Sequence, residues 1–135
     1  MTYLVDANVL SEGTKPSPDA RVLEWLRLHE KEMAVDAVIL GEVRYGILLL
    51  PAGQRRTRLE SWFDVFVRTI RCLPWDAATG LRWAELMVAL RKRGTGIPLQ
   101  DGMIAATALR HGLKVATRNV RDFKATGAEV VNPFD

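Results

Sequence analysis

The chain has 135 residues, of which 48% are hydrophobic and 26% are charged, and its formal net charge is +3. This composition is typical of a globular domain with a sizeable core and excludes a disordered chain. The mildly basic charge is compatible with nucleic-acid binding without requiring it. The single cysteine, Cys72, cannot form an internal disulfide, and no apolar run is long enough to span a membrane. Because the first predicted strand starts at residue 2 or 3, we expect no signal peptide. We therefore expect a cytoplasmic protein that has no membrane partner.

The first predicted strand, Tyr3-Leu4-Val5, runs into Asp6 without any alternation of polar and apolar residues. Such a run is typical of a strand that is buried on both faces, as in parallel sheets. Ligands of open α/β sheets bind just outside the carboxyl ends of the strands, so Asp6 is a candidate functional residue. The alternative is that Asp6 only caps the short helix that follows it.

Helices alternate with short strands along the rest of the chain. The expected elements are, in order, a loop over 13–18, a helix from Ala20 to about Glu30 capped by Asp19, a strand Met33–Val35, a helix capped by Asp36 and running to about Leu50, a helix from about Gln54 to Ile70, a strand Cys72–Pro74, a helix from Ala77 to about Arg93 capped by Asp76, a helix Ile97–Arg110, a strand Leu113–Thr117, a helical turn Val120–Phe123 and a strand Glu129–Val131. This order predicts the α/β class, as one three-layer α/β/α domain over 1–135 with a central, mostly parallel sheet of four to five short strands.

The helix that follows Asp36 is apolar on most sides, which predicts burial either within the domain or in a partner interface. Glu42 lies inside this helix, and none of its neighbours at three or four residues is a cation. Arg44 points elsewhere, because helical residues two apart do not face each other. Since an unpaired buried glutamate is costly, something outside the helix must compensate Glu42, and a divalent cation shared with Asp6 and Asp101 would do so. The alternative is an exposed glutamate on a wet edge of the helix.

Further acidic and amide side chains are expected at the same edge of the sheet. Asp101 lies in the first turn of a predicted helix, where the helix dipole alone would also favour an acid. Asn119 and Asp122 follow the fourth strand, whose carboxyl end lies at the same edge as that of the first. Clustered carboxylates repel one another unless a cation lies among them, and oxygen ligands suit Mg²⁺ or Mn²⁺, which serve in phosphoryl hydrolysis. The histidines and the cysteine stand apart in the sequence, which argues against a zinc site.

Four parts of the chain carry a resemblance to a known family. They are Leu4–Glu12, Gly41–Gly46, Asp101–Leu109, and Thr117–Phe123 followed by Val131–Phe134. Together, in this order and at this spacing, they resemble PIN-domain ribonucleases, and most closely the VapC-like toxins of type II toxin–antitoxin pairs. The resemblance covers essentially the whole chain, and it implies a single PIN domain whose first three acids are Asp6, Glu42 and Asp101.

The chain departs from the family pattern at two positions. Asn119 occupies the fourth acidic position, where many relatives have aspartate, and Asp122 follows one helical turn later. Asn119 could complete the site by binding a water, or Asp122 could substitute for the acid or simply cap or pair with an arginine. Asp36 stands where relatives often carry serine or threonine, and we interpret it as a helix cap.

The resemblance implies an endoribonuclease that depends on Mg²⁺, or on Mn²⁺, and cleaves single-stranded or looped RNA. Asp6 and Asp101 would bind the metal, Glu42 would bind or orient the attacking water as a base, and the products would carry a 5′-phosphate and a 3′-hydroxyl. The resemblance also implies homodimers, a cognate antitoxin whose tail covers the active groove, and a toxin–antitoxin hetero-oligomer on DNA.

An acidic site needs cations nearby to hold RNA, and phosphate contacts of this kind make binding salt-dependent. The candidates are Arg91, Lys92, Arg93, Arg118 and Arg121, with Arg55, Arg56, Arg58, Arg68 and Lys124 as further ones. For each group the alternative is a solvated helix end, which attracts cations without any RNA.

Two other classes of function compete with the ribonuclease hypothesis. The first is a catalytically weak PIN-fold module that acts mainly by binding an antitoxin and DNA, which Asn119 in place of an acid would suit. The second is a phosphoacceptor domain of the receiver type, which needs a pair of acids after the first strand and a lysine after the last. Ala7 follows Asp6, and Asn132-Pro133 ends the last strand, so this pattern is missing.

Overall fold

The computed structural model describes all residues from Met1 to Asp135 and contains one five-stranded sheet. Its strands are β1 (Tyr3–Val5), β2 (Met33–Asp36), β3 (Arg71–Leu73), β4 (Lys114–Ala116) and β5 (Val130–Val131). They lie in the order β3-β2-β1-β4-β5, and every neighbouring pair is parallel. The expected α/β class is confirmed, and all five short strands are present, each within one or two residues of its predicted bounds.

The register of the sheet brings three polar residues to one edge. Leu4 pairs with Ala34, and Val5 pairs with Ala116. Continuing these pairs past the strand ends places Asp6 beside Asp36 on one side and beside Thr117 on the other. The residues that precede them in β1, β2 and β4 are fully buried, because helices cover both faces of the central strands. The core therefore ends directly at a row of polar side chains.

The helices lie close to their predicted positions. They are α1 (Ala7–Leu10), η1 (Ser11–Thr14), α2 (Ala20–Leu28), η2 (Glu30–Glu32), α3 (Ala37–Leu48), α4 (Gln54–Thr69), α5 (Ala77–Lys92), α6 (Leu99–His111) and α7 (Val120–Ala125), where η marks a 3-10 helix. One difference is at α6, which starts after Pro98 instead of at Ile97, because the proline itself takes the position before the first helical residue. Asp19, Asp36 and Asp76 cap their helices as expected.

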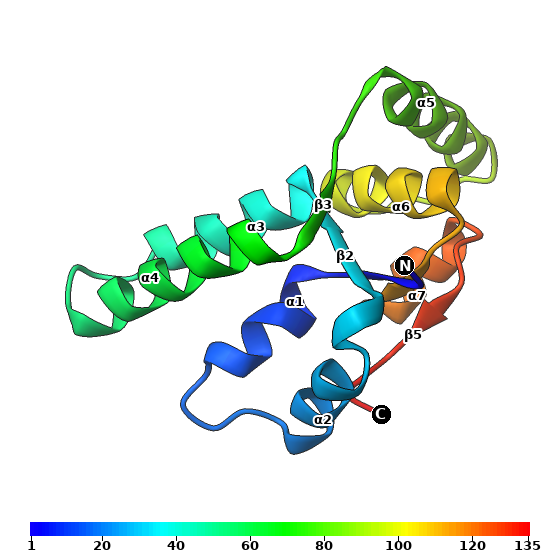
Figure 1. Ribbon diagram of the computed structural model, residues 1–135. Coiled ribbons are helices and arrows are strands. Elements are labelled where there is room, and N and C mark those ends of the chain that lie inside the picture. Colours follow the sequence, from blue (N-terminus) through cyan, green and yellow to red (C-terminus); the bar gives the residue numbers. More distant parts are fainter.

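Three helices determine the shape around the polar edge (Figure 1). Helices α3 and α4 pack together as a hairpin that projects to one side of the sheet, and α6 lies against the sheet with α5 packed on its outer side. The alanines at 105, 106 and 108 on α6 are fully buried. These small side chains let α6 approach the sheet closely, so that its first turn is held rigidly near the ends of β1 and β2.

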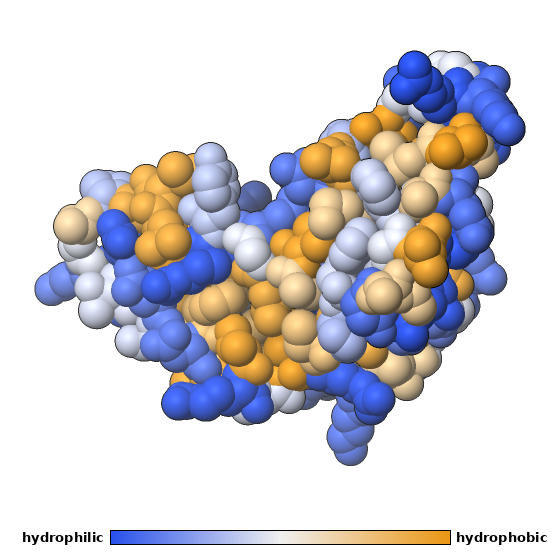
Figure 2. Space-filling model, turned by 90° about the horizontal axis from the view of Figure 1, so that it is seen from above, coloured by the Kyte–Doolittle hydropathy of each residue, from blue (hydrophilic) through white to orange (hydrophobic).

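Of the two alternatives predicted for α3, burial on all sides within the domain is not what the structure shows. Only Ile39, Val43 and Ile47 of this helix are buried, and Tyr45 and Leu48 are 66% and 46% exposed. Helix α4 covers just one side of α3, so the rest of its apolar surface faces outwards. Seen from above, apolar side chains also show on the surface on both sides of a notch in the molecule (Figure 2). The partner interface suggested for α3 stays a prediction.

Two smaller expectations concern Cys72 and the membrane. Cys72 is a free and exposed cysteine, and it lies in β3, the edge strand of the sheet. None of the helices combines the length and the apolar character needed to cross a lipid bilayer.

Candidate active site

Asp6 follows β1 and is 4% exposed. One of its carboxylate oxygens accepts the backbone N–H of Ala7 at 2.8 Å, and the other accepts the hydroxyl of Thr117 at 2.7 Å. Asp6 therefore caps α1, as the alternative reading expected, and also faces the end of β4. Burial raises the pKa of Asp6, although these hydrogen bonds oppose the rise. A buried carboxylate that no cation neutralises is thus built into the carboxyl edge of the sheet.

Glu42 lies on α3 and is partly buried, and its Oε1 atom is buried without any hydrogen-bond partner. Burial first, and then the charges of three neighbouring carboxylates, raise the pKa of Glu42 from 4.5 to about 7. Those carboxylates are Asp6, Asp101 and Asp36, in order of decreasing effect. The structure thus brings Glu42 near Asp6 and Asp101, and no cationic side chain compensates it.

Asp101 lies in the first turn of α6, is 6% exposed, and has a buried Oδ2 atom without a hydrogen-bond partner. Burial first, and then the charges of Asp6 and Asp122, raise the pKa of Asp101 to about 6. Asn119, by contrast, is exposed, and its side chain makes no capping hydrogen bond. Of the two candidates for the fourth position, Asp122 is the one that lies beside another acid of the group.

The donor set fits a hard divalent cation. All the available ligands are carboxylate oxygens, and two of them, Glu42 Oε1 and Asp101 Oδ2, are buried and unpartnered. No three acidic, histidine or cysteine side chains are gathered closely enough to enclose one ion by themselves. Mg²⁺ commonly takes one or two carboxylates and keeps several waters, so it does not need such a closed cage. The pair of unpartnered oxygens is therefore the part of the structure that fits a metal best.

Two polar residues of this edge were not identified as site residues from the sequence. Thr117 bridges Asp6 and the backbone N–H of Asn119, at 2.7 and 3.0 Å. Asp36, interpreted only as a cap, is fully buried and is near enough to raise the pKa of Glu42. Asp36 ends β2 and Thr117 directly follows β4, the two strands beside β1. Their place at the carboxyl ends of these strands could have identified them as site residues.

An open cavity of about 460 Å³ adjoins Glu42. It is lined by Val38, Gly41, Glu42, Tyr45 and Gln100. Tyr45 lies three residues after Glu42 on α3, so both side chains point to the same side of the helix. The cavity is thus an open approach to the carboxylates from solvent, with an exposed aromatic ring at its rim.

The predicted RNA-binding cations occupy different surroundings. Arg118 stacks on the Phe134 ring with its guanidinium carbon 3.8 Å from the ring centre. Arg93 donates a hydrogen bond of 2.6 Å to the carbonyl of Ala125, which joins α5 to α7. The side chains of Arg91, Lys92 and Arg121 are exposed. Arg118 and Arg121 lie closest in sequence to Asp122, and Arg93 has a structural contact of its own.

A second groove lies between η1 and the α3–α4 hairpin, and we call it the η1–α4 groove. Its two adjoining cavities measure about 460 and 200 Å³ and are lined by Ser11, Gly13, Thr14, Lys15, Pro16, Val43, Gly46, Ile47, Leu50, Arg55, Arg58, Leu59 and Trp62. The floor is largely apolar, and three cations, Lys15, Arg55 and Arg58, stand along it. An extended or helical segment with apolar and acidic side chains would match this surface.

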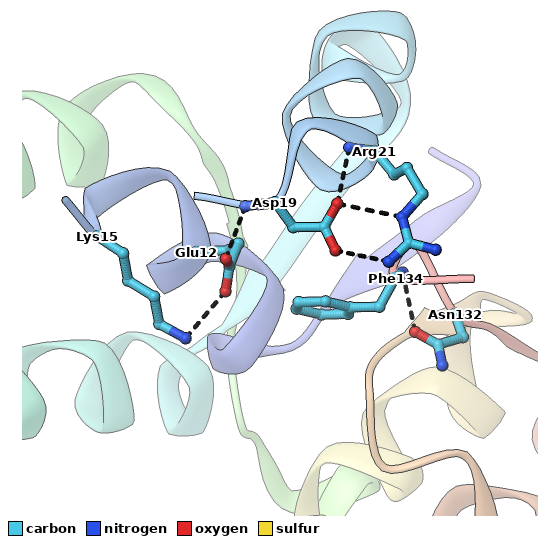
Figure 3. A network of polar contacts seen from close by, with 6 residues as sticks. All are labelled: Glu12, Lys15, Asp19, Arg21, Asn132 and Phe134. Carbon is cyan, nitrogen blue, oxygen red and sulfur yellow. Dashed lines mark hydrogen bonds and ion pairs between the residues drawn. The ribbon is translucent and has the colours of Figure 1, made fainter. Parts of the chain in front are cut away.

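Glu12 fixes one wall of this groove (Figure 3). Its carboxylate accepts the backbone N–H of Asp19 at 2.9 Å and pairs with Lys15 Nζ at 2.9 Å. The Asp19 carboxylate in turn holds Arg21 through a contact of 2.9 Å. Glu12 thereby ties η1 to the start of α2 and holds Lys15 at the groove.

Comparisons with known proteins agree with this architecture. The model of the PIN domain family matches residues 3–129. The chain is 37% identical to the VapC ribonuclease Y4jK of Sinorhizobium fredii over 136 residues, which cover 98% of this chain and 97% of the relative.

Two solved structures are also similar along their whole length. The crystal structure of FitAcB from Neisseria gonorrhoeae superposes with a TM-score of 0.93 at 33% identity, covering 98% of this chain and 99% of that one. The structure of FitAB bound to an IR36 DNA fragment has a TM-score of 0.90 at 32% identity, covering 99% and 96%. With a family match over residues 3–129 and a relative that is 37% identical over nearly its full length, this chain belongs to the PIN domain family, among its VapC-type members.

Proposed function

We propose that this protein is a metal-dependent endoribonuclease and the toxin of a type II toxin–antitoxin pair, acting in the cytoplasm. The observation that carries the proposal is the group of uncompensated acids at the carboxyl edge of the sheet, in which Glu42 Oε1 and Asp101 Oδ2 are buried without partners. Buried charge of this kind is retained at functional sites, where a ligand supplies the missing partner. The similarity to a VapC ribonuclease supports RNA as the substrate.

The chain's own residues take distinct roles in this proposal. Asp6 and Asp101 would hold Mg²⁺ or Mn²⁺, with Asp122 beside Asp101 as the fourth acid. When bound, the metal supplies stabilisation of the charge that develops on the phosphate oxygens. Glu42 lies near these acids and would orient the attacking water or accept its proton as the base.

The nucleic acid would approach through the cavity beside Glu42. Tyr45 stands exposed at the rim of that cavity and can stack on a base. Arg118 and Arg121, on the α7 side, would contact phosphates, which predicts that RNA binding weakens as salt concentration rises. Arg91 and Lys92 at the end of α5 are more distant candidates for the same role.

The antitoxin would bind in the η1–α4 groove, and its tail, as the resemblance implies, would cover the active groove. Two similar solved structures are FitAcB and FitAB bound to a DNA fragment, and this similarity supports a protein partner and assembly on DNA. The cations and apolar side chains of the groove fit an acidic, amphipathic segment of such a partner. Homodimers, which the exposed apolar side of α3 would suit, belong to the same proposal.

The test is cleavage of RNA by the purified chain in Mg²⁺, in Mn²⁺ and in chelator. We expect cleavage only with metal, and we expect Asp6→Asn to lower the rate by about 100-fold or more, since it removes a charge from the metal site. Unimpaired cleavage by Asp6→Asn across a metal titration would refute the assignment of Asp6. Metal binding without turnover on any RNA would instead favour a module that acts mainly through antitoxin and DNA.

A further inference from the structure

Asp36 is the one fully buried acid of the chain, with 0% exposure, and both of its oxygens are used. Oδ1 accepts the backbone N–H of Ile39 at 2.9 Å, which caps α3. Oδ2 accepts the hydroxyl of Thr107, on α6, at 2.7 Å. No cation pairs with Asp36, so its charge is stabilised by hydrogen bonds alone, and an uncharged cap would avoid that cost.

The bond between Asp36 and Thr107 joins the two helices that carry predicted catalytic acids. It is the only side-chain hydrogen bond between β2 or α3 and α6. Glu42 lies on α3, the helix that Asp36 starts, and Asp101 lies on α6, the helix that carries Thr107. A change in this bond would therefore move Glu42 and Asp101 relative to each other.

We propose that Asp36 is a positioning residue of the active site, which fixes the separation of Glu42 and Asp101 through its hydrogen bond with Thr107. The proposal rests on the proposed function and extends it to a residue that contacts neither the substrate nor the metal. Outer residues of this kind matter because small displacements of reacting groups are costly.

A second aspartate caps its helix through a threonine of that same helix. Asp76 caps α5 and accepts both the backbone N–H and the hydroxyl of Thr79, at 3.1 and 2.9 Å. Thr79 is also fully buried, but it lies on the same helix as its aspartate. The other oxygen of Asp76 forms an ion pair with Arg110 at 3.4 Å, and both side chains are partly exposed. The second oxygen of Asp36 instead accepts a buried hydroxyl from a residue 71 positions away in the chain.

The hydrogen-bond distances of the Thr107 hydroxyl also favour a contact between the two helices. A threonine inside a helix commonly bonds back to the carbonyl four residues before it. For Thr107 that acceptor is Met103, at 3.5 Å, whereas Asp36 lies at 2.7 Å. The hydroxyl is thus directed across the helix interface and not along its own helix.

The test compares Thr107→Val with Thr79→Val. Both variants delete a buried hydroxyl that bonds to a capping aspartate, so both should lower the melting temperature to a similar extent. We expect only Thr107→Val to weaken Mn²⁺ binding to the free protein, measured by titration calorimetry, and to lower kcat for RNA cleavage, each by about 10- to 100-fold. Thr107→Ser, which keeps the hydroxyl, should restore both quantities.

The proposal is overturned if Thr107→Val melts like Thr79→Val but binds Mn²⁺ and cleaves RNA as the unchanged protein does. If Thr107→Val does not fold, Thr107→Ala replaces it in the test. This variant leaves a small cavity instead of a methyl group against Asp36, and we expect the same losses of Mn²⁺ affinity and kcat. If the unchanged protein cleaves no RNA, the proposed function fails, and the Mn²⁺ affinities still decide whether Asp36 positions the acids.

Discussion

Two glutamates, Glu12 in η1 and Glu42 in α3, are both withdrawn from solvent but differ in what surrounds them. Both have a buried Oε1 atom without a hydrogen bond, but Lys15 Nζ lies 2.9 Å from that of Glu12, and this ion pair holds the pKa of Glu12 below its usual value. No cation pairs with Glu42, and burial among other acids raises its pKa to about 7. The same residue type is thus satisfied in one place and uncompensated in the other.

The difference teaches that burial of an acid does not by itself identify a functional site. Glu12 stabilises the junction of η1 and α2, and its charge needs nothing further. Glu42 lies where three more carboxylates oppose its ionisation. No structural role explains why an acid is placed there. The missing partner, more than the burial, is what assigns Glu42 to chemistry.

The largest contrast is expected in catalysis. Glu42→Gln should lower the rate of RNA cleavage by about 100- to 10,000-fold, because it removes the proposed base. Glu12→Gln should leave the rate nearly unchanged, since Glu12 contacts Lys15 and the backbone of Asp19 and none of the acids. Initial rates on one RNA at saturating Mn²⁺ measure both, and equal losses in the two variants would abolish the distinction.

The next contrast concerns the antitoxin. Reversing Arg55 and Arg58 to glutamate should weaken antitoxin binding by about 10-fold or more, because like charges would then meet in the groove. Glu12→Gln should weaken it less, by releasing Lys15. Arg27→Glu is the matched control, since Arg27 is exposed and lies outside the groove. If the variant with both charges reversed also cleaves RNA more slowly when no antitoxin is present, Arg55 and Arg58 would be assigned to RNA binding instead.

A smaller effect is expected on stability in the presence of metal. A ligand that binds only the folded state at 100 times its Kd stabilises it by about 2.7 kcal/mol. Mg²⁺ should therefore raise the melting temperature of the unchanged protein and of Glu12→Gln, but not that of Asp101→Asn. Melting curves with Mg²⁺ and with chelator provide the measurement, and a full shift in Asp101→Asn would exclude Asp101 as a ligand.

The smallest contrast is in the pH dependence of stability without metal. The pKa of Glu42 rises from 4.5 to about 7 on folding, so the folded state binds more protons in that range and its stability falls as pH rises. The pKa of Glu12 is lowered from 4.5, so its contribution is present above that pH and is lost as pH falls through the folded value. Glu42→Gln should flatten the neutral part of the stability curve and Glu12→Gln the acid part. The free energy of unfolding, measured by denaturation at a series of pH values in chelator, checks this. The expectation is contradicted if both substitutions alter the same pH range of the stability curve.

The sequence predicted well whatever depends on local pattern. Apolar runs located all five strands, aspartates located the helix starts, and the absence of a cation near Glu42 in its helix identified it as unusual. The sequence left open whether the domain or a partner covers α3, because a helix that is apolar all round does not reveal how many neighbours cover it.

What the sequence could not supply are contacts between distant residues. Thr117 bonds to Asp6 across 111 positions, and Thr107 bonds to Asp36 across 71. Such pairs depend on strand order and helix packing, which no local pattern encodes. The proximity of Asp122 to Asp101, which favours Asp122 over Asn119, likewise required the packing of α7 beside α6.

The central claim is that the uncompensated acids form a divalent-metal site. Titration calorimetry with Mn²⁺ near neutral pH tests it most directly, in two buffers of different ionisation enthalpy that also count released protons. We predict that the unchanged protein and Glu12→Gln bind Mn²⁺ with release of protons, and that Asp101→Asn does not bind measurably. Equal binding by Asp101→Asn, or no binding by the unchanged protein, would contradict the account.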